Sequence, residues 1–279
     1  VIDEAHCISD WGHDFRPDYR RIVRVLQAIP SNVPVLATTA TANDRVVNDV
    51  KSQLGQNIIL QRGSLVRKSL KLQNINMPSP AARMAWLAQT IPVIPGSGII
   101  YTLTQRDAER VSEWLQINNI DAKAYHADIS DREDGGSIKE ELEQQLLNNE
   151  IKVLVATVAL GMGFDKPDLG FVIHFQRPAS VVHYYQQVGR AGRAVDEAYG
   201  ILLCGEEDDH IADFFIRNAF PPQQHISEII RALDESNNGL SVPEMQRVLN
   251  LRKNQIDKTL KFLTVESPSP ITKIGSKWQ

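Results

Sequence analysis

The sequence has little cysteine, no long apolar run and no excess of basic charge. Its 279 residues include only two cysteines, Cys7 and Cys204, which excludes a disulfide framework and a four-cysteine zinc site and indicates a reducing compartment such as the cytoplasm. No stretch approaches the ~18 uninterrupted apolar residues of a membrane span, so we expect no membrane partner. The net charge of −4 and the pI near 6.0 mean that any nucleic-acid binding must use local patches.

A phosphate-binding loop of the form Gly-x-x-x-x-Gly-Lys-Ser/Thr is also missing from these residues. The chain begins at Val1, without an initiator methionine or a signal peptide, on an apolar pair that we interpret as the middle of a strand. We therefore expect a fragment of a longer protein. The composition, 42% apolar and 23% charged, is typical of roughly two globular domains.

Two arginines, Arg190 and Arg193, each follow a glycine directly after an apolar helical pattern over 181–188. Arginine presents a fork of donors that matches phosphate oxygens, and the glycines let the backbone turn sharply and approach a ligand closely. Taken alone, this segment is equally compatible with a solvated basic turn. The residues upstream favour the anionic ligand.

Two adjacent carboxylates, Asp3 and Glu4, follow the apolar pair at 1–2, which we interpret as the end of a buried strand. Ligands bind at that edge of open α/β sheets. In phosphoryl transfer, one acid can hold Mg²⁺ and its waters while its neighbour orients or deprotonates the attacking water. An exposed acidic turn is the alternative interpretation.

Rings alternate with polar residues in the next segment, which is too rich in Gly, Asp and Pro for an ordinary helix or strand. Such rings can fill a core, or they can stack on bases at about 1–3 kcal/mol each. The whole stretch 3–19 resembles the Walker B (DEAH) motif and aromatic-rich loop of RecQ-family DNA helicases in superfamily 2. The resemblance implies that His6 belongs to the nucleotide site and that four residues contact single-stranded DNA: Trp11, His13, Phe15 and Arg16.

Small hydroxyl and methyl side chains occupy 38–42, after an expected strand at 33–37. Thr41 with Asp44 predicts a capping box for the following helix, and a capped helix alone would explain the segment. In RecQ-like helicases the same Thr-Ala-Thr-Ala segment couples nucleotide state to DNA. The resemblance therefore implies that Thr39 and Thr41 contact nucleic acid.

Helices and strands alternate from about residue 84, which predicts an α/β fold with a parallel sheet. Strands are expected at 98–101, 122–126, 151–156 and 171–175, and helices at 81–94, after Thr104, at 133–149 and at 181–188. A last strand of the preceding lobe is expected at 58–60, and the residues after it are expected to form a connection between domains.

A loop with two glycines around a methionine follows the strand expected at 151–156. Gly161 and Gly163 allow backbone amides to approach a phosphate, and Asp165 can accept from a ribose hydroxyl or hold an arginine. Alone, the loop is a turn with a packed methionine. In series with the arginine pair it resembles helicase motifs V and VI. The resemblance, which covers residues 1 to about 205, implies a nucleic-acid contact at Thr157 and an ATP site completed by Gln186, Arg190 and Arg193, with the two arginines as arginine fingers.

The residues after Cys204 predict a small helical region that starts at a solvated acidic run over 206–209. Ser241 and Glu244 form a capping box with a proline in the first turn. The next helix turns its apolar residues inward and leaves Lys253 and Lys258 outward, where they would contact phosphates. This helix-turn-helix pattern, with residues 271–278 as a wing, favours DNA binding by a winged helix over packing alone.

The resemblance implies RecA-like parallel-sheet lobes in three parts: a partial lobe 1 over 1–66, a complete lobe 2 over 67–206, and a zinc-free helical and winged-helix-like extension over 207–279. It implies an ATP-dependent 3′-to-5′ DNA helicase of repair and recombination, with ATP and Mg²⁺ as cofactors, Asp3 holding Mg²⁺ through water, and single-stranded and duplex DNA as partners.

The fragment alone is expected to be inactive. An RNA helicase of the same superfamily and a non-catalytic nucleic-acid-binding module are the alternatives. We expect a cytoplasmic, nucleoid-associated location, and protein partners stay open.

Overall fold

The computed structural model describes residues 1–8, 22, 25–26, 28–30, 32–40, 43–55, 58–63, 66–77, 79–129, 136–160, 163–178, 180–205, 208–217, 220–266 and 268–279. The chain divides into two compact units. One is Arg62–Asp213, and the other holds Val1–Gln61 together with Phe214–Gln279. The boundaries expected after 66 and 206 stay predictions. Within the residues described, no helix is long and apolar enough to cross a membrane.

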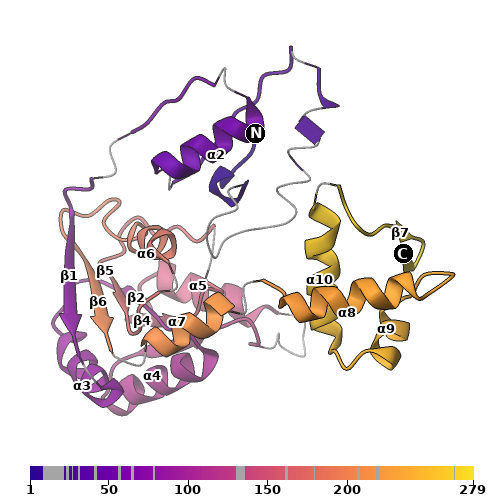
Figure 1. Cartoon of the computed structure of the whole chain (residues 1–279). Coiled ribbons are helices and arrows are strands. Elements are labelled where there is room, and N and C mark those ends of the chain that lie inside the picture. Colours follow the sequence, from indigo (N-terminus) through magenta and orange to yellow (C-terminus); the bar gives the residue numbers. More distant parts are fainter. Residues whose placement is uncertain are drawn as a thin grey trace. The chain divides into compact units, whose positions relative to one another are not determined.

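The Arg62–Asp213 unit is built on a six-stranded parallel sheet in the order β1-β6-β5-β2-β4-β3 (Figure 1). The strands are β1 (Leu70–Asn76), β2 (Gly98–Tyr101), β3 (Ala122–Tyr125), β4 (Val153–Ala156), β5 (Phe171–His174) and β6 (Ala198–Cys204). The helices are α3 (Pro80–Thr90), α4 (Gln105–Ile117), α5 (Ile138–Leu147) and α6 (Val181–Val188), and α7 (Asp208–Arg217) follows β6. The predicted α/β class with a parallel sheet is confirmed.

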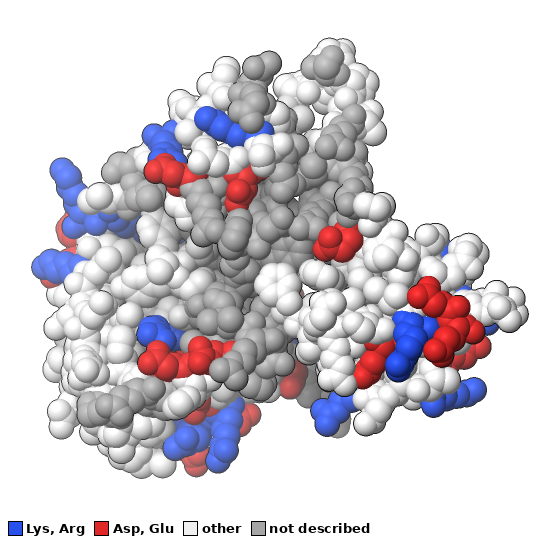
Figure 2. All heavy atoms as spheres, in the orientation of Figure 1, with Lys and Arg blue, Asp and Glu red and all other residues white. Residues whose placement is uncertain are grey.

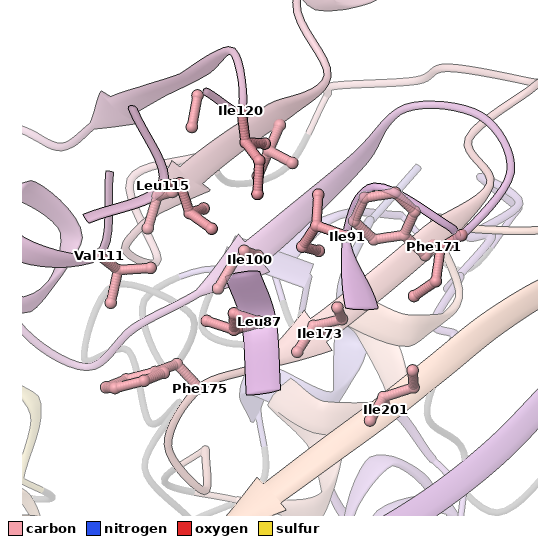
Figure 3. Packing of buried hydrophobic residues seen from close by; sticks show 14 of the residues in the cluster. Leu87, Ile91, Ile100, Val111, Leu115, Ile120, Phe171, Ile173, Phe175 and Ile201 are labelled. Carbon is pink, nitrogen blue, oxygen red and sulfur yellow. The ribbon is translucent and has the colours of Figure 1, made fainter. Parts of the chain in front are cut away.

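Both faces of the sheet are covered, as a parallel sheet requires. Successive strand residues point to opposite faces. Ile100 packs with α3 and α4, while its neighbours in β2 pack with α5 and α6. Figure 3 shows side chains of this cluster pointing toward one another, from α3 and the residue after it (Leu87, Ile91), α4 (Val111, Leu115) and the strands (Ile100, Phe171, Ile173, Ile201). Fully apolar central strands are therefore buried on both sides.

Helix starts in this unit follow caps that the sequence encodes. The Thr104 hydroxyl accepts from the backbone N–H of Asp107 at 3.1 Å and donates to its carboxylate at 2.7 Å, as predicted. The Ser180 hydroxyl accepts from the N–H of His183 at 3.1 Å and so begins α6. Each cap satisfies an N–H group that the first turn leaves without a helical partner.

Strand β1 was not predicted, because residues 70–76 were assigned to the connection between domains. It pairs with β6 at the edge of the sheet, and most of its side chains are exposed. An edge strand therefore lacks the apolar run that identified the central strands. The helix expected at 133–149 begins only at Ile138, with Ser137 as its N-cap.

Residues 1–61 contain a short 3-10 helix (Ala5–Ile8) and α2 (Asp44–Leu54). The strand predicted at 33–37 is reduced to one parallel bridge between Ile2 and Ala37. The strand predicted at 58–60 is wrong: these residues form no strand, and Ile59 is 96% exposed, so its apolar side chain has no sheet to cover.

The cap of α2 also differs from the prediction. Asn43 is the N-cap, and its side chain accepts from the N–H of Val46 at 2.8 Å. Thr41, which was predicted to start the capping box, lies outside the described residues. An asparagine immediately before the helix is an equally strong cap and stands closer to the first helical residue.

The C-terminal part contains α8 (Gln223–Asp234), α9 (Val242–Val248), α10 (Lys253–Val265) and an antiparallel hairpin of β7 (Lys273–Ile274) and β8 (Lys277–Trp278). Its core is formed by apolar side chains of all three helices, among them Ile229, Met245, Ile256, Leu260 and Leu263. The Ser241–Glu244 capping box is present as predicted. The two successive helices are present, and the hairpin lies within the residues expected to form a wing. The helix-turn-helix and winged-helix assignments stay predictions.

Candidate functional site

The two adjacent carboxylates lie directly after the Ile2 bridge. Thr38 Oγ1 donates to Asp3 Oδ1 at 2.8 Å, and the backbone N–H of Glu4 donates to the same oxygen at 2.9 Å. These two bonds lower the pKa of Asp3, the threonine bond most, so the carboxylate is ionised at neutral pH. Glu4 has a φ of +50°, a left-handed conformation that is uncommon outside glycine. Such strain is often found at functional sites.

His6 connects the acidic segment to the threonine-rich segment. Its Nδ1 lies 3.1 Å from Thr39 Oγ1 and 3.2 Å from Glu4 Oε2, and the residue is 7% exposed. Together with the Thr38 bond to Asp3, two threonines contact the acidic motif. The acidic segment and the threonine-rich segment are therefore in direct side-chain contact.

The arginine segment lies at the end of α6. Arg190 Nη1 donates to the carbonyl oxygen of Phe164 at 2.7 Å, and Arg193 Nη1 donates to Asp165 Oδ1 at 2.6 Å. Both acceptors follow Gly163, whose φ of +101° is open to glycine but strained for other residues. The structure therefore joins the two segments that the sequence analysis treated as separate motifs. Gly161 lies outside the described residues.

Helix α6 is anchored to the sheet by a buried histidine. His174 is 1% exposed, its Nε2 lies 2.8 Å from Gln187 Oε1, and its ring stacks on Tyr101. Burial lowers the pKa of His174 to about 4, against a smaller rise from the Gln187 bond, so the ring is neutral at neutral pH. Gln186, the predicted site residue next to Gln187, is half-buried on the same helix.

A buried ion pair corrects the expectation of a solvated acidic run at 206–209. Asp208 and Arg83 are 1% and 0% exposed, and Asp208 Oδ1 lies 3.3 Å from Arg83 Nη1. Asp208 Oδ2 accepts from the N–H groups of Arg177 at 2.9 Å and Gly205 at 3.1 Å. Residues 206–207 lie outside the described part of the chain, and Asp209 has the expected exposure, at 70% of its side chain. Sequence alone gave no signal, because the partner lies 125 positions away.

The predicted nucleic-acid residues are spread over the chain. Thr157 is buried after β4, and its hydroxyl accepts from the N–H of Ala159 at 3.3 Å. Lys253 and Lys258 are exposed on α10, and partial burial lowers the pKa of Lys258. The aromatic-loop residues lie outside the described part of the chain: Trp11, His13, Phe15 and Arg16. On the face shown in Figure 2, basic and acidic side chains are interspersed, so this face agrees with local contacts rather than a broad basic surface.

Within the described residues, no group of three or more His, Cys, Asp or Glu side chains could hold a metal ion. Mg²⁺ is typically bound through one or two carboxylates together with substrate phosphates and waters. The ionised Asp3 carboxylate, exposed to solvent beside Glu4, has the chemistry for that smaller donor set.

Two family models match the sequence, "DEAD/DEAH box helicase" over residues 1–50 and "Helicase conserved C-terminal domain" over residues 83–195. The fold and these matches define the class, a helicase with RecA-like α/β architecture. The solved structure "S. cerevisiae Dbp5 bound to RNA and ADP BeF3" has a TM-score of 0.59 and 19% identity, and the match covers 78% of this chain and 56% of that one. At this identity the match shows the fold alone.

Curated relatives narrow the class. The RecQ-like DNA helicase blm-1 of Caenorhabditis elegans is 40% identical over 213 residues, which is 75% of this chain and 21% of that protein. The ATP-dependent DNA helicase RecQ of Bacillus subtilis (strain 168) is 34% identical over 236 residues, 78% of this chain and 36% of that protein. The chain is a relative of the RecQ-like DNA helicases, and the predicted resemblance is confirmed. It spans well under half the length of these two relatives.

Proposed function

We propose that this chain is part of the motor of an ATP-dependent DNA helicase of the RecQ type, which translocates 3′ to 5′ on single strands and unwinds duplex DNA in repair and recombination. The observation that carries the proposal is the bonding of the acidic motif to the threonine segment, through Asp3 with Thr38 and His6 with Thr39. A motor needs such a contact, because hydrolysis at the carboxylates must change the affinity of another segment for DNA.

The residues take distinct roles in this proposal. ATP with Mg²⁺ would supply the phosphoanhydride bond whose hydrolysis drives movement. Asp3, whose two hydrogen bonds lower its pKa, would hold the metal ion through water, and Glu4 would orient or deprotonate the attacking water. Gln186, Arg190 and Arg193 bind the phosphates, and Arg193 exchanges the Asp165 carboxylate for phosphate oxygens.

DNA contacts follow a similar division. Thr39, Thr41, Thr157 and the aromatic segment over 11–16 sense the single strand, and Lys253 with Lys258 contacts phosphates from α10. Such contacts do not require a basic protein, since a few local cations suffice to bind a backbone. We further propose a cytoplasmic, nucleoid-associated location, which the scarcity of cysteine supports.

Two other functions make different predictions. An RNA helicase of the same superfamily would be stimulated by RNA rather than by DNA, and the aromatic segment after Glu4 argues against it. A binding module without turnover would bind nucleic acid and leave ATP intact. For the 279 residues alone we propose this second behaviour, because they contain no Gly-Lys-Ser/Thr phosphate loop.

The test is nucleic-acid-stimulated ATP hydrolysis by the protein extended upstream to include a phosphate-binding loop. We expect single-stranded DNA to stimulate hydrolysis more than RNA does. Glu4→Gln and Arg193→Ala should each abolish the stimulated rate, since an arginine finger contributes roughly 10³ to 10⁵ in rate. Glu113→Gln, an exposed carboxylate on α4, is the matched control and should retain the rate.

Three results would contradict the proposal in different ways. Stimulation by RNA alone would favour the RNA helicase. An absence of hydrolysis with intact DNA binding would favour the module without turnover. Hydrolysis that persists in Glu4→Gln and Arg193→Ala would show that the nucleotide chemistry has been assigned to the wrong residues.

A further inference from the structure

The segment just before β1 holds the turn that carries the arginine pair. Arg67 Nη1 donates to the carbonyl oxygens of Gly189 and Ala191, each at 2.7 Å. Ser69 Oγ donates to the carbonyl oxygen of Gly192 at 2.6 Å. Three carbonyl groups just after α6 are thus bonded by side chains that lie more than 120 positions earlier in the sequence.

These bonds suit the end of a helix. The last carbonyl groups of a helix lack intrahelical partners, and the helix dipole makes this end partly negative. Gly189 is the C-cap of α6, so a guanidinium bonded to its carbonyl oxygen is favoured by the dipole, while the Ala191 and Gly192 carbonyls lie in the turn beyond the helix. Because its acceptors are neutral carbonyls rather than carboxylates, the positive charge of Arg67 is added to the arginine-rich turn without being cancelled by these bonds.

The geometry restrains the backbone on both sides of Arg190. The Gly189 carbonyl lies in the peptide unit that joins Gly189 to Arg190, and the Ala191 carbonyl lies in the unit that joins Ala191 to Gly192, so the two bonds of Arg67 restrain the backbone just before and just after the Arg190–Ala191 pair. Gly192 has a φ of +73°, and an added Cβ there would lie 2.9 Å from Ser69 Oγ. The turn that leads to Arg193 is therefore packed directly against the Arg67–Ser69 segment.

We propose that Arg67 is a positioning residue that holds the Gly189–Arg193 turn so that Arg190 and Arg193 can meet phosphate groups. This inference rests on the proposed function, because it assigns those two arginines to ATP. Arg67 also belongs to the connection that joins residues 1–61 covalently to β1.

Catalysis should be more sensitive to Arg67 than stability is. The side chain is exposed, so its truncation leaves no buried cavity and no buried charge. A displacement of about 1 Å in a catalytic group can cost roughly 10²-fold in rate. A residue that only caps α6 would lower stability slightly and leave turnover unchanged.

The experiment compares Arg67→Ala, Arg67→Lys and the neighbouring exposed control Lys68→Ala in the upstream-extended protein. We expect Arg67→Ala to lower kcat by about 10- to 100-fold with a change in the KM for ATP of less than about threefold. Arg67→Lys should restore part of kcat, because an ammonium can reach a carbonyl but lacks the planar fork. Lys68→Ala should match the parent protein.

Amide hydrogen exchange over residues 187–195 gives a second measurement that does not need ATP. We expect faster exchange in Arg67→Ala than in Lys68→Ala, confined to this segment. If the parent protein hydrolyses ATP and Arg67→Ala keeps its kcat, the inference is wrong while the proposed function stands.

If the parent protein does not hydrolyse ATP, the proposed function fails. Amide hydrogen exchange then decides whether Arg67 holds the Gly189–Arg193 turn. Equal exchange in Arg67→Ala and Lys68→Ala would overturn the inference. Faster exchange in Arg67→Ala that is limited to the turn would support the inference. Faster exchange throughout the Arg62–Asp213 unit, with no recovery of kcat in Arg67→Lys, would also overturn the inference, because the residue would then support the fold as a whole.

Discussion

Removal of the charge of Asp208 tests the buried ion pair most directly. In Asp208→Asn the side chain keeps its size and one acceptor oxygen, while the guanidinium of Arg83 keeps its charge. That guanidinium also donates to the carbonyl oxygen of Phe175 at 2.6 Å and lies 4.8 Å from the centre of the Phe175 ring. Neither contact supplies a negative charge, so the variant removes the carboxylate charge of Asp208 from beside the buried cation.

The expected loss follows from burial. Both side chains are almost fully shielded from water, with exposures of 0% and 1%. Breaking a buried pair by removing one partner costs about 3–5 kcal/mol, because the remaining charge stays desolvated. Replacing both residues, as in Arg83→Met with Asp208→Asn, removes both charges and should restore most of the stability. Asp209→Asn is the matched control, and its exposed pair with Arg177 should contribute less than about 1 kcal/mol.

The assay has to report on the Arg62–Asp213 unit alone, because unfolding of a chain with two units need not be a single transition. Amide hydrogen exchange of the central strands β2 and β5, measured against urea concentration, gives the unfolding free energy of that unit. Equal stability of Asp208→Asn and Asp209→Asn would refute the reasoning. A double variant that is less stable than Asp208→Asn would also refute it, because charge burial would then not be the cause.

Two further predictions concern stability. Burial lowers the pKa of His174 from 6.5 to about 4, so between these pH values the unfolded chain binds a proton that the folded chain does not. The free energy of unfolding therefore falls as the pH drops through this range, by roughly 3 kcal/mol in all. In His174→Phe, urea titrations at pH 4 to 7 should show a weaker dependence of the unfolding free energy on pH. If that dependence is unchanged, another group causes it and the prediction is wrong. Ser241→Ala removes the N-cap of α9 and should destabilise this helix by about 1 kcal/mol, measured by amide hydrogen exchange over 242–248. Ser236→Ala is the control, and an equal effect of the two variants would contradict the prediction.

The sheet could be predicted from sequence where burial was complete. β2 and β4 are apolar along their whole length and β5 is apolar up to His174, because helices cover these strands on both faces, and this pattern identified them. β1 gave no such signal, since an edge strand with one covered face can contain polar residues such as Lys71, Gln73 and Asn74. The apolar run at 58–60 gave a false signal, because a short run does not encode the partner that a strand needs.

The candidate site was predictable only in its local part. The spacing of Asp3, Glu4 and His6 and of the two arginines can be read directly from the sequence. The contacts that hold these groups cannot, because they join residues far apart: Thr38 with Asp3, Arg67 with the α6 turn, and Arg83 with Asp208. Residue type also did not reveal burial, since positions 208 and 209 are both aspartate and only the Asp208 side chain is buried.

The same long-range contacts bear on the two interpretations left open for the arginine segment. A solvated basic turn would leave its guanidinium groups in water and its carbonyl groups bonded to water. Instead, Arg190 donates to Phe164, Arg193 to Asp165, and Arg67 to the turn itself. The charge of Arg67 is added to the turn, because its two acceptors there are neutral carbonyls, while the Asp165 carboxylate offsets the charge of Arg193. Like charges repel, and a bound anion would reduce that repulsion, so we interpret the segment as a phosphate-binding turn.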